Sequence, residues 1–168
     1  SSRIKDSGTL RLAVKRSKSN LKRFAYALNA IRKEESANKN LANILTNPVC
    51  IETNKMEEID RYYQEILNDK EDNPQKLAIR KALSTKDIFL IQGPPGTGKT
   101  TVISEIVCQI LNNHPKDKIL LASQSHVAVD HAVNKITKLL PDKRTIRIGR
   151  INSTKIAKES QNLLLPNQ

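Results

Sequence analysis

The feature that most constrains the fold of this chain is a glycine-rich loop between an apolar run and an amphipathic helix. Three of the five glycines in the chain lie within it. The loop matches the phosphate-binding pattern in full and reads Gly93-Pro94-Pro95-Gly96-Thr97-Gly98-Lys99-Thr100. Glycines let successive backbone N–H groups turn inward onto an anion, and the helix that follows adds partial positive charge. The loop therefore predicts a site for the phosphates of a nucleotide.

The segments around the loop alternate between short apolar runs and helical periodicity. Buried strands are predicted at 88–91 and 118–122, with a third short strand at 145–148. A helix marked by apolar residues from Ile103 is expected to end near Asn113, and another is marked by apolar residues from Val129 to Leu140. Such a β-α-β-α-β order is typical of a parallel sheet with right-handed crossovers. The predicted fold class is therefore α/β, a P-loop NTPase sheet of the RecA-like kind.

The part of the chain before the loop is predicted to be mainly helical. The alternation in 9–15 predicts a strand, and helices are expected at 19–33, within 36–49 where one stops before Pro48, and at 56–67. A polar, acidic stretch at 68–72 predicts a linker. Asn73 as cap and Pro74 in the first turn then predict a helix to about Leu83. We therefore expect two domains, residues 1–68 and residues 69–168.

Positive charge is concentrated at the N-terminus. The chain has a formal net charge of +12, and residues 1–33 hold ten basic side chains against one acid. The alternatives are a solvated face or a surface that follows the phosphates of a nucleic acid. Aromatic residues make up only 3% of the chain, which disfavours an aromatic base-stacking surface.

Cellular location is suggested by the cysteines and by the hydropathy. Cys50 and Cys108 lie outside any metal-binding or CxxC spacing, so we expect free thiols in a reducing compartment. No apolar run approaches membrane-spanning length, and residues from Ser1 do not resemble a signal peptide. The expectation is a cytoplasmic or nuclear protein without a membrane partner.

The loop pattern assigns chemical roles to individual residues. Lys99 is expected to reach the β- and γ-phosphates, and the Thr100 hydroxyl is expected to bind Mg²⁺. These two are the predicted catalytic residues. The predicted nucleotide contacts are Gly93, Pro94, Pro95, Gly96, Thr97, Gly98, Lys99, Thr100 and Thr101.

Two flanking segments resemble motifs of superfamily 1 helicases related to the nonsense-mediated decay helicase and to senataxin. The same loop sequence also occurs in AAA+ ATPases, so the segments on either side of the loop distinguish between the two families. Upstream, Asn73-Pro74-Gln75-Lys76-Leu77-Ala78-Ile79 resembles the Q motif, whose glutamine, here Gln75, reads the adenine edge in that family. Downstream, Leu120-Leu121-Ala122-Ser123-Gln124-Ser125-His126-Val127-Ala128-Val129-Asp130 resembles motif Ia.

Motif Ia implies a grip on the backbone of single-stranded nucleic acid. The candidate contacts are Ser123, Ser125 and His126, since hydroxyls and free N–H groups at a helix start suit a phosphate. Simple helix capping is the alternative for Ser125 and His126. The segment Thr145-Ile146-Arg147-Ile148-Gly149-Arg150 also resembles the strand that follows motif Ia in this group.

The resemblance implies the N-terminal part of the first RecA-like ATPase domain of a helicase. Residues 1–68 would then hold the end of an accessory β-domain and a helical stalk, and residues 69–168 a partial ATPase domain. The implied activity is ATP hydrolysis with Mg²⁺, coupled to movement along single-stranded RNA or DNA, with a second RecA-like domain as partner.

Several motifs of a complete helicase core are not found in this sequence. No Asp-Glu pair ends an apolar strand after motif Ia, so we expect an incomplete sheet and no turnover by this chain alone. An AAA+ ATPase, which would need neither Gln75 nor the motif Ia residues, is the second hypothesis. A non-catalytic basic module that binds nucleic acid is the third.

Overall fold

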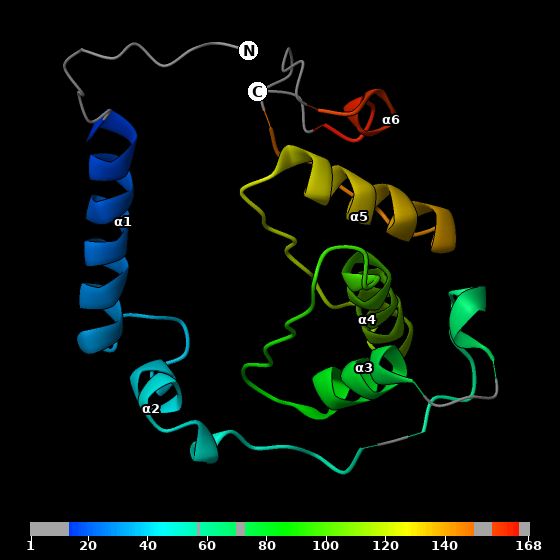
Figure 1. The fold of residues 1–168 in the computed structure, drawn as a ribbon, viewed down its shortest axis with the longest axis horizontal. Helices are drawn as coiled ribbons and strands as arrows, with labels where there is room; N and C mark the ends of the chain where they lie inside the picture. The colour runs from blue at the N-terminus through cyan, green and yellow to red at the C-terminus, as the bar shows by residue number, and fades with distance from the viewer. Residues whose placement is uncertain (1–13, 57, 70–72, 150–155, 165–168) are drawn as a thin grey trace, which may run out of the picture. The chain divides into compact units, whose positions relative to one another are not determined.

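The computed structural model describes residues 14–56, 58–69, 73–149 and 156–164. By its internal contacts the chain divides into two units, residues 1–51 and residues 52–168. Figure 1 follows the elements along the chain. The proposed functional boundary between residues 68 and 69 stays a prediction, because compactness alone does not define a functional domain.

The first unit is helical in its described part. Helix α1 spans Val14–Arg32, α2 spans Leu41–Thr46, and the 3₁₀ turn η1 spans Pro48–Cys50. Most of the strand predicted at 9–15 lies outside the described residues. Val14 and Lys15, its last two residues, belong to α1 and correct that prediction. Leu21, Phe24 and Leu28 are exposed along α1, so its apolar stripe is not covered.

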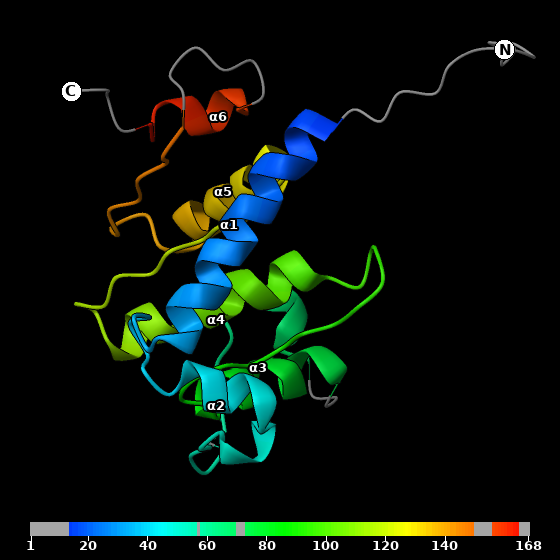
Figure 2. The same cartoon turned by 90° about the vertical axis from the view of Figure 1, so that its left-hand side faces the viewer.

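The second unit is built on three helices, with α4 between the other two (Figures 1 and 2). Helix α3 spans Pro74–Ser84, α4 spans Lys99–Asn113, and α5 spans His126–Leu139. A short helix α6, Lys158–Gln161, packs against α5. These positions confirm the helices predicted after the linker. Asn73 caps α3 as expected, because its side chain accepts the backbone N–H of Lys76.

The core of the second unit joins α3 and α4 to the segment before them. Its members are Tyr62, Leu67, Ile79 and Val102, with Ile59, Ala78, Leu83 and Ile106 packed around them. Of the helix predicted over 56–67, only the 3₁₀ turn η2, Glu65–Leu67, forms in the described part. The prediction was wrong because the backbone N–H groups of Tyr63 and Gln64 donate to the Glu105 side chain instead of to a helix carbonyl.

The predicted parallel sheet does not appear in the described residues. Segments 88–91, 118–122 and 145–148 carry no strand ladder, and the described pairing consists of isolated bridges, Thr53 with Thr85 and Arg147 with Leu164. A strand is stabilised only when a neighbour lies about 4.8 Å away and takes up its N–H and C=O groups. Leu90 is 86% exposed, Leu120 82% and Ile148 71%, so these side chains are also left uncovered by other parts of the described chain.

None of the described helices combines the length and the apolar character needed to cross a lipid bilayer.

Candidate functional site

The glycine-rich loop runs from the segment after α3 directly into the N-terminus of α4. Gly98 is the N-cap residue of α4 and has φ of 77°, and Gly96 has φ of 81°. Both values lie in the left-handed region, which glycine adopts without steric strain. The sequence therefore places glycine where the backbone must reverse to present the first N–H groups of α4 at one point.

Lys99 and Thr97 close the loop from inside. The Lys99 Nζ donates to the carbonyls of Gly93 at 2.7 Å and Pro94 at 2.6 Å, and the Thr97 hydroxyl donates to Pro94 at 2.9 Å. A Cβ on Gly93 would lie 2.7 Å from the Thr97 Oγ1, so a larger residue there would require the Thr97 side chain to move. The Lys99 ammonium thus folds back onto the carbonyls of its own loop.

Gln75 is brought to the loop from α3. Its Nε2 donates to the Thr97 carbonyl at 2.9 Å, and a Cβ on Gly98 would meet the same amide group. The Asn73 cap and Pro74 fix the start of α3 and so fix the position of Gln75 in the first turn. The structure therefore places the predicted adenine-reading residue beside the predicted phosphate residues, 22 positions apart in sequence.

The remaining predicted nucleotide contacts lie at the same end of α4. Pro94, Pro95 and Gly96 form the exposed tip of the loop, and Thr100 and Thr101 are half-buried in the first turn. Thr100 presents a hydroxyl oxygen, a donor type that suits Mg²⁺. No group of three or more His, Cys, Asp or Glu side chains in the described ranges could hold a metal ion, so a magnesium ion here would depend on Thr100, phosphate oxygens and water.

The junction before α5 gathers Ser123, Ser125 and His126, which are all exposed. The Ser125 hydroxyl accepts the backbone N–H of Ala128 at 3.4 Å and caps α5, and the Ser123 hydroxyl accepts the N–H of Ser125 at 3.1 Å. The capping alternative thus describes Ser125 in this structure. An exposed capped helix start still leaves its first N–H groups directed outward, as phosphate binding requires.

A buried ion pair below this junction was not predicted from the sequence. Asp130 is 1% exposed and accepts from the Arg147 Nε at 2.8 Å and from the Ala157 N–H at 2.9 Å. The Arg147 Nη2 lies 3.2 Å from the His126 Nδ1. Burial raises the pKa of Asp130, but the Ala157 N–H and the Arg147 guanidinium lower it more, so it lies below its ordinary value.

A second buried carboxylate ties the segment before α3 to α4. Glu105 is fully buried. Its Oε1 accepts the backbone N–H of Tyr63 at 3.0 Å and the side-chain amide of Gln109 at 2.8 Å. Its Oε2 accepts the backbone N–H of Gln64 at 3.0 Å. The Gln64 side chain donates to the Thr101 carbonyl at 3.2 Å. An acid at a buried position of an amphipathic helix is the signal that could have revealed both Glu105 and Asp130.

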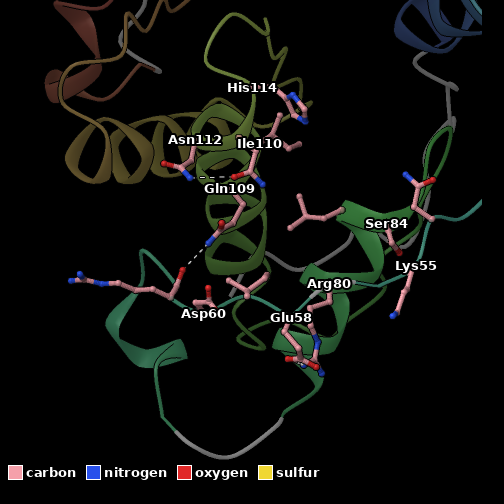
Figure 3. A pocket seen from close by; sticks show the side chains of 14 residues that line it. Lys55, Glu58, Asp60, Arg80, Ser84, Gln109, Ile110, Asn112 and His114 are labelled. Atoms are coloured by element: carbon pink, nitrogen blue, oxygen red, sulfur yellow. Dashed lines mark hydrogen bonds and ion pairs between the residues drawn. The ribbon is translucent and has the colours of Figure 1, made fainter.

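A cavity of about 600 Å³ lies at the C-terminal end of α4, away from the glycine-rich loop. Figure 3 shows it between the C-terminal ends of α3 and α4, lined by Arg80 and Ser84 from α3, by Asn112 from α4 and by His114 just after α4. The loop at the N-terminus of α4 carries the phosphate-binding pattern and this cavity does not, so the loop is the candidate nucleotide site.

Comparison with known proteins identifies the family. Residues 70–168, more than half of the chain, match the family model AAA_11, described as "AAA domain". An "uncharacterized ATP-dependent helicase" of Methanocaldococcus jannaschii is 38% identical over 98 residues, which cover 58% of this chain and 14% of that protein.

Two proteins from Saccharomyces cerevisiae are also similar in sequence to this chain. The "DNA polymerase alpha-associated DNA helicase A" is 36% identical over 102 residues, 61% of this chain and 14% of that protein. The "DNA replication ATP-dependent helicase/nuclease DNA2" is 50% identical over 62 residues, 37% of this chain and 4% of that protein. The chain thus spans about a seventh or less of the length of these relatives. It belongs to the AAA_11 family, the P-loop ATPase domain found in superfamily 1 helicases.

Proposed function

We propose that this chain is the ATP-binding part of an ATP-dependent helicase or translocase that acts on single-stranded RNA or DNA. The observation that carries the proposal is the convergence of Lys99, Thr100 and Gln75 on the glycine loop at the N-terminus of α4. ATP hydrolysis would then belong to the complete protein, with a second RecA-like domain closing over the nucleotide. Within this reading, segments 88–91, 118–122 and 145–148 are strands of the RecA-like sheet.

Each residue of the loop has a role in this proposal. The N–H groups of the loop bind the phosphates, while the Lys99 ammonium is drawn from the Gly93 and Pro94 carbonyls to the β- and γ-phosphates. Mg²⁺ would be held by Thr100 and would neutralise phosphate charge. The Gln75 amide, held against Thr97, is positioned to donate to and accept from adenine.

The nucleic-acid partner is proposed for the exposed start of α5. Ser123, Ser125 and His126 offer hydroxyl, imidazole and helix-terminal N–H groups to a phosphate backbone. The relatives include a protein named "DNA-binding protein SMUBP-2" from Mus musculus and a "Regulator of nonsense transcripts 1" from Caenorhabditis elegans. The high positive charge of the N-terminal segment would add affinity that depends on salt concentration.

The test uses the protein at its natural length and the variant Lys99→Ala. We expect the variant to lose ATP binding by about 100-fold or more, since removal of a charged phosphate contact costs roughly 3 kcal/mol. ATP hydrolysis by the natural-length protein should rise when single-stranded RNA or DNA is added. Hydrolysis without a response to either strand would favour the AAA+ alternative, and unchanged ATP affinity in Lys99→Ala would overturn the site assignment.

A further inference from the structure

A lysine from α5 reaches the phosphate end of α4. The Lys135 Nζ donates to the Thr101 Oγ1 at 2.8 Å. Thr101 lies in the first turn of α4, two positions after Lys99. Ala132, Val133 and Ile136, which lie near Lys135 in the sequence of α5, are buried, and α5 packs against α4. A second ammonium group therefore stands at the candidate nucleotide site, contributed by a different helix.

The start of α4 does not favour a nearby positive charge such as that of Lys135. The first turn of a helix carries partial positive charge, which repels a cation. Within the described ranges no Asp or Glu lies at ion-pair distance from Lys135, although other lysines, such as Lys76 and Lys86, have carboxylate partners. A neutral side chain would serve equally well to bridge the helices through the Thr101 hydroxyl. The charge is explained if a phosphate completes the arrangement.

We propose that Lys135 is a positioning residue for nucleotide phosphates that acts through Thr101. Because the ammonium donates to the Thr101 oxygen, the hydroxyl proton is directed away from Lys135 and is free to donate to a phosphate oxygen. Polarisation by the neighbouring positive charge makes this hydroxyl a stronger donor. The inference rests on the proposed function, since it extends the same phosphate site by one residue on another helix.

The arrangement also links the two proposed binding sites. Helix α5 begins at His126, in the candidate strand-binding junction, and carries Lys135 to the first turn of the nucleotide helix.

The experiment measures affinities for ATP and for inorganic tripolyphosphate by competition with a fluorescent ATP analogue, in the protein at its natural length. The variants are Lys135→Gln, Lys135→Arg, Thr101→Val and the double variant Lys135→Gln/Thr101→Val. Lys138→Gln, an exposed lysine on the same helix, is the matched control. We expect Lys135→Gln to weaken ATP and tripolyphosphate alike by roughly ten-fold, while Lys135→Arg and Lys138→Gln stay within about three-fold of wild type.

The double variant separates action through Thr101 from a purely structural effect. If Lys135 acts through Thr101, Lys135→Gln should weaken binding further by less than three-fold once Thr101→Val is present. Unchanged ATP affinity in Lys135→Gln would overturn the inference, as would a loss for ATP without one for tripolyphosphate, failure of Lys135→Arg to retain binding, or fully additive losses. Lys99→Ala is measured in parallel. If it binds ATP normally, the proposed function fails as well; if only Lys135→Gln is neutral, the inference alone fails.

Discussion

The Glu105 carboxylate is predicted to hold the segment before α3 in place, and Glu105→Gln tests this directly. Both carboxylate oxygens accept backbone N–H groups, from Tyr63 and from Gln64, each at 3.0 Å. A glutamine of nearly the same shape keeps one oxygen and replaces the other by an NH₂ donor. One of the two N–H groups must then face a donor and lose its partner.

The expected magnitude follows from this single lost acceptor. Leaving one buried N–H group unsatisfied costs roughly 1–3 kcal/mol, which corresponds to about a 5- to 150-fold change in a local opening equilibrium. Hydrogen exchange followed by mass spectrometry or NMR should therefore show faster exchange by that factor at whichever of the Tyr63 and Gln64 amides loses its acceptor. Exchange in the C-terminal turns of α5 should change little.

The control is Glu65→Gln, which alters an exposed acid in the same segment. It should leave exchange at Tyr63 and Gln64 unchanged. If Glu105→Gln exchanges at the wild-type rate at both amides, the carboxylate does not anchor this segment. Equal acceleration by Glu65→Gln would show instead that segment charge, and not the buried acceptor, determines the exchange.

Two further predictions concern the other buried groups. The pKa of Asp130 is lowered from its ordinary value of 3.8 in the folded state, so the ionised carboxylate stabilises the fold above that value and this stabilisation is lost as the pH falls through the lower, folded pKa. The difference in unfolding free energy between wild type and Asp130→Asn, measured by denaturant titration, should therefore be full at pH 6 and shrink below about pH 4. A difference that stays constant with pH would refute this. Burial and the nearby Glu105 raise the pKa of the Cys108 thiol to about 12, while Cys50 is exposed. Iodoacetamide should therefore label Cys50 at least roughly 100-fold faster than Cys108 at pH 8, as measured by peptide mass mapping. Comparable labelling rates for the two thiols would contradict this prediction.

The sequence predicted those elements whose signals are local. Asn73 and Pro74 determine the start of α3, and the glycine-loop pattern determines the start of α4, because caps and left-handed residues act within a few positions of the chain. The helix expected over 56–67 failed because its N–H groups are taken by Glu105, about 40 positions later, and local periodicity carries no information on such a contact.

The candidate site divides in the same way. Pattern and resemblance named Lys99, Thr100, Gln75 and the residues of the motif Ia junction, and the structure brings Gln75 to the loop. The supporting residues Arg147 and Lys135 were not recognised, since each matters through a partner on another element. Contact of the motif Ia serines with nucleic acid stays a prediction. In this structure Ser125 acts as a helix cap.

The exposed apolar segments around Leu90, Leu120 and Ile148 have a practical consequence for handling the chain. Each combines bare hydrophobic side chains with backbone groups that carry no ladder, which is the template on which edge-to-edge aggregation grows. Concentrated preparations of this stretch should scatter light and bind hydrophobic dyes, and polar substitutions at Leu120 should suppress both. Binding measurements would therefore start from dilute protein with solubilising additives.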